Sequence, residues 1–326
     1  MDADPPRSDA AAAQPAGTPR LIGLDWGSSA LRAWLLGDAG RILARRESAA
    51  GALGLDADGF HAALLALCAD WLEAWPRLPV VACGMVGSRE GWREAPRVRA
   101  PAGFEQLAAA LLAFDEALGR PFRIVPGVMA RGQIDSPDLM RGGETQVFGA
   151  LRHRDGLFVL PGTHSRWVEV RGRRIVALRT YMTGEIYALM RRHSTLARMC
   201  TDPDDSPARQ ADALRAFDEG VDHAAAHPGS LTHLLFTART EALLEGLAAH
   251  QVPAYLSGLL IGTELADAAA WSPHDLVPTL VARSELSSRY AHALHRLRVR
   301  ARVADGDSAA AGLYALARHA GLLDAA

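Results

Sequence analysis

The chain has 326 residues, more than a typical single domain, so we expect two lobes with a cleft between them. Its formal net charge of −2 gives no electrostatic basis for binding nucleic acid or an anionic membrane surface. Three widely spaced cysteines (Cys68, Cys83 and Cys200) argue against a disulfide framework and against a structural zinc site.

Residues 1–19 are rich in Ala, Pro and Asp and lack a basic stretch followed by an apolar one. This composition predicts a disordered tail rather than a secretory signal. No apolar run in the sequence reaches the roughly 20 residues that a membrane-spanning helix requires. Since the sparse cysteines also fit a reducing compartment, we expect a soluble, cytoplasmic protein.

The first half of the chain predicts three short strands and then alternating helices and strands. The three strands are short apolar runs separated by turns that contain glycine, at 21–24, 31–36 and 41–46. Large apolar side chains recur at helical spacing over 60–75, which predicts a helix. The elements expected after it are a buried strand at 79–85, a helix at 104–118 and a strand at 122–127.

The second half begins with the same pattern. A strand at 156–160 meets a glycine turn, and two further strands follow at 166–170 and 175–180. The remainder is mostly helical, with strands expected at 276–282 and 299–304. The order of strand, glycine turn, strand, hairpin and strand therefore occurs twice, which is typical of the actin-like ATPase superfamily. We predict an N-terminal lobe at 20–150 and a C-terminal lobe at 151–326.

The first turn, at 25–29, has the composition of a phosphate-binding loop. Gly27 allows the backbone to approach an anion, while Ser28 and Ser29 offer hydroxyl and N–H donors. Asp25 stands at the end of the strand, where a carboxylate can hold Mg²⁺ directly or through water. The alternative is a polar β-turn whose aspartate bonds its own backbone.

A second loop of the same construction follows the strand 156–160. Gly162, Thr163 and His164 again place a glycine and a hydroxyl residue directly after an apolar strand. Two such loops, one in each lobe, fit a clamp on the β- and γ-phosphates, which a purely structural hairpin does not require. His164 is expected in this phosphate cleft, with an ordinary core or surface histidine as the alternative.

Between the two loops, glycines precede Glu144 at a predicted helix start. We take Glu144 as a catalytic base or a metal partner. The alternative is an acid that only favours the helix dipole. Which of Asp25 and Glu144 binds metal, and which takes a proton, stays open at this point.

Taken together, these segments resemble the 2-dehydro-3-deoxygalactonokinase family over nearly the whole chain after the tail. The resemblance rests on seven blocks in the same order: 24–29 with 31–35, 84–88 with Gly91 and Trp92, 140–142 with 144–146, 161–164 with Trp167 and Val168, 183–185, 256–262, and 287–290. It implies an α/β protein of two actin-like ATPase (ribonuclease H-like) lobes. It also implies ATP- and Mg²⁺-dependent phosphoryl transfer to the terminal hydroxyl of 2-dehydro-3-deoxygalactonate, in galactonate and galactose breakdown.

A keto acid substrate needs carboxylate recognition, best supplied by an arginine or by a turn rich in N–H donors. The candidates for the sugar site are Arg32, Gly87, Ser88, Trp92, Arg131 and Arg141. Each arginine has the alternative of a plain surface position. Adenosine is expected at the turn after the strand 276–282, with Ser284 as the candidate.

The sequence departs from the pattern of the family at two positions. Arg283 replaces a usual glycine beside the adenosine turn, which puts close backbone contact with adenine in doubt. Gly143 replaces a usual acid, which leaves more of the chemistry to Glu144.

Two other functions are alternatives to the kinase. One is a phosphoanhydride phosphatase of the same superfamily, in which Glu144 activates water. The other is a non-catalytic nucleotide-binding regulator, although the chain has no appended helix-turn-helix and no basic face for DNA. The expected partners are ATP and a small sugar acid, without nucleic acid or membrane, and a homodimer stays open.

Overall fold

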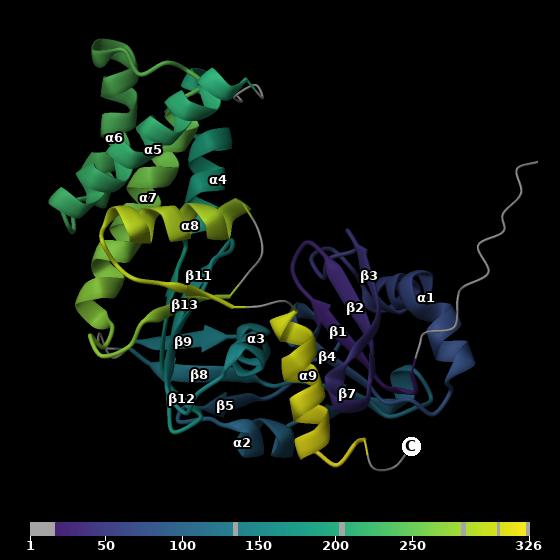
Figure 1. The fold of residues 1–326 in the computed structure, drawn as a ribbon. Helices are drawn as coiled ribbons and strands as arrows, with labels where there is room; N and C mark the ends of the chain where they lie inside the picture. The colour runs from purple at the N-terminus through teal and green to yellow at the C-terminus, as the bar shows by residue number, and fades with distance from the viewer. Residues whose placement is uncertain (1–16, 133–135, 202–205, 282–284, 305–306, 324–326) are drawn as a thin grey trace, which may run out of the picture.

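The structure is a computed structural model that describes residues 17–132, 136–201, 206–281, 285–304 and 307–323, and it is built around two large β-sheets (Figure 1). In the described part of the chain the first sheet has six strands in the order β3-β2-β1-β4-β7-β6. They are β1 (Pro19–Trp26), β2 (Leu31–Gly37), β3 (Ile42–Ser48), β4 (Val80–Gly84), β6 (Leu112–Ala113) and β7 (Phe122–Ile124). The strands predicted from the apolar runs in this half are confirmed.

The second sheet repeats the pairing pattern of the first. Over the described residues it has five strands in the order β12-β11-β10-β13-β14. They are β10 (Gly156–Leu160), β11 (Ser165–Arg171), β12 (Arg174–Tyr181), β13 (Pro278–Leu280) and β14 (Arg302–Val303). In each sheet the opening strand pairs antiparallel with the next strand and parallel with a later one, so the predicted duplication is confirmed.

A smaller sheet of β5 (Arg97–Arg99), β8 (Gly127–Arg131) and β9 (Pro137–Met140) adjoins β12 of the second sheet. The carboxylate of Asp138 on β9 accepts hydrogen bonds from the backbone N–H and the hydroxyl of Thr180, both over 2.7 Å. These contacts tie β9, which ends shortly before Glu144, to β12 of the second sheet.

The helix predicted at 104–118 is wrong beyond its first six residues. Helix α2 (Phe104–Ala109) ends early, and β6 follows it and pairs antiparallel with β7. Phe114 is buried beside Phe122, and its backbone N–H donates to the Phe122 carbonyl over 2.9 Å. Antiparallel pairing with the next strand therefore decides this segment against its helical pattern.

Helices α3 (Gly143–Ala150) and α9 (Ser308–His319) pack against each other between the two sheets (Figure 1). They approach closely because both carry glycine at the crossing. A Cβ on Gly149 would lie 1.7 Å from the Ser308 carbonyl oxygen, and one on Gly312 would lie 1.9 Å from that of Thr145. The C-terminal helix α9 thus lies against the helix that begins with Gly143 and Glu144.

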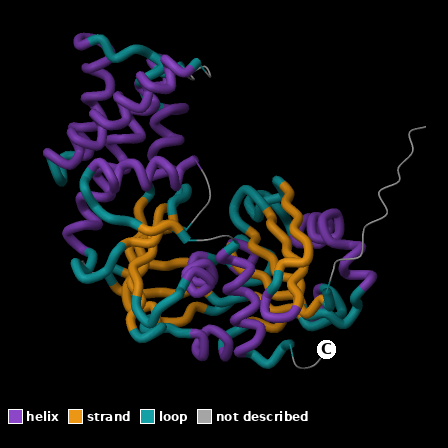
Figure 2. The backbone as a smooth tube through the Cα atoms, viewed as in Figure 1, coloured by secondary structure: helices purple, strands orange, loops and turns teal. Residues whose placement is uncertain are grey.

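Among the described residues, six further helices pack against the sheets or against one another. They are α1 (Ala57–Ala74), α4 (Thr183–His193), α5 (Pro207–Ala226), α6 (Leu231–Thr240), α7 (Val252–Trp271) and α8 (Glu285–Arg296). Helix α1, capped by the Asp56 side chain, packs its apolar face on the first sheet. Helices α4 to α7 form a bundle that projects beyond the second sheet (Figure 2).

The small-residue segment 256–262 packs on a helix. A Cβ on Gly258 of α7 would lie 2.1 Å from the Phe217 carbonyl oxygen of α5, and one on Gly220 of α5 would lie 2.3 Å from that of Tyr255. Glycine therefore lets these two long helices touch along their backbones.

The predicted tail falls outside the described residues except for 17–19, of which Pro19 opens β1. The division into lobes at residue 150 stays a proposal, and α9, from the end of the chain, packs on β1 and β4 of the first sheet. None of the helices in the described part of the chain combines the length and the apolar character that crossing a bilayer requires.

Candidate active site

Asp25 lies buried at the carboxyl end of β1, 3% exposed. Its Oδ2 accepts a hydrogen bond from Arg32 over 2.5 Å and a longer one from the Gln146 amide over 3.4 Å. Burial raises the pKa of Asp25, while the charge of Arg32 and the hydrogen bonds act in the opposite direction. A carboxylate is thus held under the first loop by one cation.

The first loop is fixed by its backbone, and its serine side chains are exposed. The Gly27 N–H donates to the Ala30 carbonyl over 2.9 Å, and the Gly27 carbonyl accepts from Ala52 over 2.9 Å. Ser28 and Ser29 present their side chains to solvent. Three of the predicted loop residues therefore stand together at the end of β1, beside Asp25.

Glu144 is fully buried in the first turn of α3. Its Oε1 accepts from the Gly142 N–H over 2.8 Å and from the Thr145 hydroxyl over 3.3 Å. Its Oε2 has no hydrogen-bond partner among the described residues. Burial raises the pKa of Glu144 to about 7, although the nearby charges of Arg141 and Arg166 act to lower it.

Cys83, at the end of β4, connects the two acids. It pairs with Asp25 in the parallel ladder, and both Asp25 and Glu144 act electrostatically on its thiol, whose pKa burial raises well above its usual value. Close by, Gly142 has φ +86°, and a Cβ there would lie 2.9 Å from the Cα of Gly84. The two predicted catalytic acids therefore meet where β1, β4 and α3 converge.

The second loop lies against the start of α4. A Cβ on Gly184 would lie 2.4 Å from the Gly162 carbonyl oxygen and 2.8 Å from the Cα of Thr163, so only glycine fits there. The Glu185 N–H donates to the Thr163 carbonyl over 2.9 Å. His164 Nε2 lies 2.6 Å from Glu185 Oε2, and both side chains remain partly exposed.

A buried carboxylate on α7 forms hydrogen bonds with residues next to this loop. Glu264, 2% exposed, accepts from Ser165 (2.7 Å) and Trp167 (2.8 Å) through Oε1, and from Tyr290 (2.6 Å) and Thr183 through Oε2. Burial raises its pKa and the four hydrogen bonds oppose that rise. The network joins β11, α4, α7 and α8.

Among the sugar-site candidates, Gly87, Ser88 and Arg141 are brought together. A Cβ on Gly87 would lie 2.7 Å from Ile124 Cγ2 and 3.2 Å from Arg141 Nη1, so a larger residue would crowd Ile124 and approach the arginine. Arg141 Nη2 donates to the Ala95 carbonyl over 3.1 Å. Arg141 Nη1 and Ser88 Oγ are both buried and have no partner among the described residues.

The other candidates lie elsewhere or are already engaged. Arg32 is paired with Asp25. Trp92 packs among aromatic rings, stacked on Phe60 with 5.8 Å between ring centroids. Arg131 is exposed at the end of β8. Ser284, like the unusual Arg283, lies outside the described residues.

Sequence reasoning gave no role to four residues of this region. Gln146 contacts Asp25, Arg166 acts electrostatically on Glu144 and has a buried Nε without a partner among the described residues, and Glu185 contacts His164. The fourth is Glu264. The available signals were a basic residue directly after the second loop and an acid shortly after the apolar segment 256–262 of α7.

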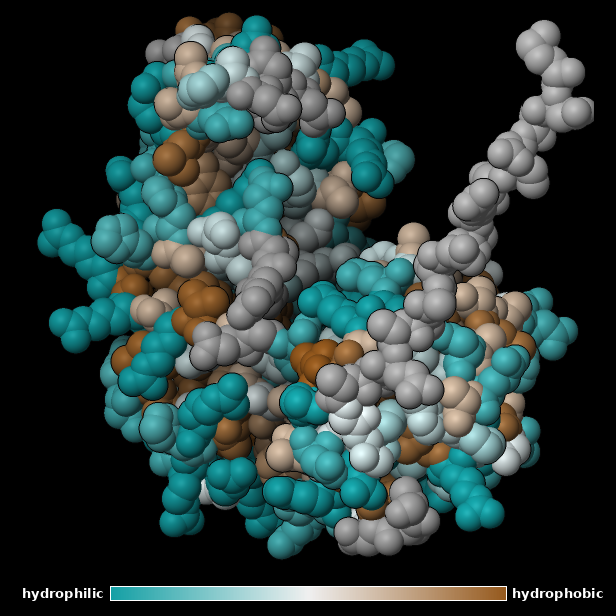
Figure 3. Space-filling model, turned by 45° about the vertical axis from the view of Figure 1, so that its right-hand side comes forward, coloured by the Kyte–Doolittle hydropathy of each residue, from teal (hydrophilic) through white to brown (hydrophobic). Residues whose placement is uncertain are grey.

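The surface is hollowed between the projecting helices and the lobe with the first sheet (Figure 3). Two matching sheets, each with a glycine loop after its opening strand, and two helices between them define an α/β protein with the two-lobe actin-like ATPase fold. A crystal structure of an ethanolamine utilization protein, EutJ, from Carboxydothermus hydrogenoformans shares this fold, with a TM-score of 0.50, 11% identity and coverage of 93% of this chain and 91% of that one.

The comparisons then identify the family. The family model for 2-keto-3-deoxy-galactonokinase matches residues 25–316. Two relatives bear the 2-dehydro-3-deoxygalactonokinase name: one from Rhizobium meliloti (strain 1021) is 38% identical over 299 residues, covering 90% of this chain and 95% of the relative. The other, from Escherichia coli (strain K12), is 37% identical over 303 residues, covering 92% and 98%.

A crystal structure from Sinorhizobium meliloti, assigned to the same enzyme, superimposes with a TM-score of 0.79 at 36% identity, covering 91% of this chain and 98% of that one. The chain belongs to the 2-keto-3-deoxy-galactonokinase family, and it is a kinase. The resemblance and the fold expected from the sequence are confirmed, and the phosphatase and regulator alternatives are not favoured.

Proposed function

We propose that this enzyme transfers the γ-phosphoryl group of ATP to the terminal hydroxyl of 2-dehydro-3-deoxy-D-galactonate, with Asp25 and Glu144 as its acidic groups. The observation that supports the site most directly is Glu144: a fully buried carboxyl with a pKa raised to about 7 and one oxygen without a partner among the described residues. A base needs a pKa near the working pH, so Glu144 suits proton acceptance.

The reaction asks three things of the protein: to align the hydroxyl, to neutralise the phosphates and to accept one proton. The substrate oxygen bonds to the γ-phosphorus, the bond from that phosphorus to the bridging oxygen breaks, and ADP leaves. The hydroxyl proton passes to Glu144 Oε2. The N–H groups and hydroxyls of the loops at Gly27 and Gly162 are the donors that we assign to the phosphates.

We assign Asp25 to Mg²⁺. In the described part of the chain no group of three or more His, Cys, Asp or Glu side chains gathers as a metal site. Mg²⁺ in kinases is held by one or two carboxylates together with nucleotide phosphates and water, so a single buried carboxylate at a strand end fits it. When bound, Mg²⁺ would neutralise charge on the β- and γ-phosphate oxygens.

For the substrate carboxylate we propose Arg141 with Ser88. Arg141 is 8% exposed and Ser88 is 8% exposed, and each has a polar atom without a partner among the described residues. Buried donors left unpaired are costly, and an anionic ligand would pair them. Arg32 and Trp92 are then positioning residues, because Asp25 and the aromatic cluster already engage them.

A coupled ADP-release assay tests the function. Purified enzyme with Mg-ATP is offered 2-dehydro-3-deoxygalactonate, its gluconate epimer, galactonate or no acceptor. We expect turnover with the keto-deoxy acid, and the epimer arm measures how strictly stereochemistry is read. Equal ADP release without acceptor would instead identify a hydrolase, and ATP binding without turnover on any acceptor would identify a regulator.

Two variants test whether Arg141 binds the carboxylate of the sugar acid. Arg141→Lys keeps the charge but loses the planar guanidinium, so we expect a raised KM for the sugar acid with an unchanged KM for ATP. Exposed Arg318→Gln is the control and should change neither constant. A cytoplasmic location belongs to the same proposal because ATP and sugar acids meet there, and a homodimer remains a prediction for solution measurement.

A further inference from the structure

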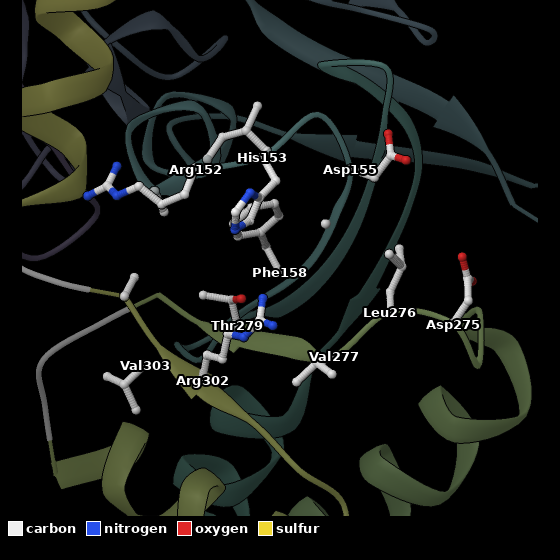
Figure 4. Close-up of a pocket in the computed structure, with 14 residues that line it drawn as sticks. Arg152, His153, Asp155, Phe158, Asp275, Leu276, Val277, Thr279, Arg302 and Val303 are labelled. Atoms are coloured by element: carbon white, nitrogen blue, oxygen red, sulfur yellow. The ribbon is translucent and has the colours of Figure 1, made fainter.

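A pocket adjoins the start of β10 (Figure 4), and none of its lining residues belongs to the loops at 25–29 and 161–165. It has a volume of about 310 Å³, within the range that small metabolites occupy. The loop that follows α3 forms one wall, and β13 and β14 form the other. Phe158 and Val277 give it an apolar part.

The polar side chains around this pocket are unevenly distributed. Arg302 of β14, Thr279 of β13 and His153 converge on the same hollow (Figure 4). Within the described residues neither Arg302 nor His153 has a hydrogen-bond or ion-pair partner. Arg152, by contrast, points toward α9 and donates to the Gly149 carbonyl over 2.9 Å. A guanidinium without a partner beside a hydroxyl is a donor set for a phosphate or carboxylate.

The acids of the pocket lie on its other side and already have partners. Asp275 is paired through both oxygens with Arg171, over 2.8 and 2.9 Å. Asp155 Oδ1 accepts from the Gly172 N–H over 2.7 Å. These two acids therefore do not neutralise Arg302, and their remaining lone pairs can accept hydrogen bonds from hydroxyl groups of a ligand. An anionic end and a hydroxyl-bearing end are the two parts of a sugar phosphate.

The elements around the pocket are those that hold the active site at their other ends. Helix α3 has Glu144 in its first turn and ends at Ala150 in this pocket. Strand β10 starts here at Gly156 and leads to the loop at Gly162. A ligand here would touch two rigid elements that position the base and the second phosphate loop.

We propose that this pocket is an effector site for a small sugar phosphate, whose phosphate pairs with Arg302 and Thr279. This goes beyond the proposed function, because the site lies outside the cleft and does not depend on which sugar acid is the substrate. The competing explanation is that Arg302 only protects an edge strand, since charged side chains on an edge discourage pairing with other molecules.

The test combines binding and turnover on the full chain. Calorimetry with glucose 6-phosphate as the probe, and with glucose and inorganic phosphate as partial probes, measures affinity in the wild type, Arg302→Gln, Thr279→Val and the control Arg318→Gln. We expect glucose 6-phosphate to bind most tightly, Arg302→Gln to weaken it at least about tenfold, and Thr279→Val to weaken it about fivefold. Basal ADP release should be unchanged in Arg302→Gln, and its response to the probe should be lost.

Each other outcome overturns the proposal. Absence of saturable binding leaves Arg302 as an edge-strand charge. Binding of equal strength in Arg302→Gln places the anion elsewhere, for example at the phosphate loops. Equal affinity for inorganic phosphate and glucose 6-phosphate rejects the sugar-phosphate class, and binding that leaves turnover unchanged rejects the effector role. None of these results depends on the identity of the sugar acid, so they are separable from failure of the proposed function.

Discussion

Arg32 donates to the buried carboxylate of Asp25 over 2.5 Å, across the antiparallel pair of β1 and β2. The two residues face each other in the strand register, so the pairing is set by the hairpin itself. Asp25 is almost fully buried while Arg32 is 38% exposed, so the cation closes the solvent side of the carboxylate.

Breaking this pair should reduce both stability and activity. Arg32→Gln leaves a buried carboxylate without its cation, and we expect a loss of about 1–3 kcal/mol in the free energy of unfolding, discounted for the exposure of Arg32. Asp25→Asn should lower kcat at least about a hundredfold. Urea unfolding and the ADP assay measure the two effects. In the double variant the stability should largely recover; a purely additive loss would show that the pair is not coupled.

The activity should depend on the protonation of Glu144. Since burial raises the pKa of Glu144 to about 7, the base is mostly protonated below that pH, and kcat/KM should rise through neutrality. Glu144→Gln cannot accept the proton and should lower kcat roughly a hundred- to ten-thousandfold. The pH–rate profile of Glu144→Gln should lack this rise in kcat/KM through neutrality. The control is Glu105→Gln, a substitution at an exposed glutamate. An unchanged pH–rate profile in Glu144→Gln would show that Glu144 is not the base.

The same carboxyl should make stability depend on pH. The pKa of Glu144 is raised in the folded state from an ordinary 4.5 to about 7, so the folded state binds more protons between these values. Stability therefore falls as the pH rises through this window and is lowest above it. Glu144→Gln removes the effect and should be more stable than wild type by roughly 3 kcal/mol at pH 8, with little difference at pH 4. Urea midpoints at both pH values, with Glu105→Gln as reference, check the sign.

Glu264 offers a matched pair of substitutions. Gln can still accept from Trp167 and Ser165 through its oxygen, and its amide can donate to the hydroxyls of Thr183 and Tyr290, so we expect a loss near 1 kcal/mol. Glu264→Leu leaves four buried donors without an acceptor and should cost about 3 kcal/mol or more. Thermal unfolding compares the two. Equal midpoints for Gln and Leu would contradict the account of this network.

The sequence alone determined the pattern of elements and the positions of the loops. Apolar runs broken by glycine turns predict strands locally, because alternation and turn chemistry act over a few residues. The same runs located Asp25, Gly27 and Gly162, and the resemblance to the family rested on seven sequence blocks in the same order. The failure at 104–118 shows the limit: Leu112 and Ala113 pair with β7, a contact that no local pattern records.

Only the tertiary structure decided the burial, the charged neighbours and the contacts of those residues. The raised pKa of Glu144, the contact of Gln146 with Asp25 and the place of Trp92 in an aromatic cluster depend on elements distant in the chain. In the sequence Glu264 is an acid in a mostly apolar helix, yet in the structure its hydrogen bonds join four elements. Burial and charge neighbours are set by packing across the whole chain, whereas strands and turns follow from neighbouring residues.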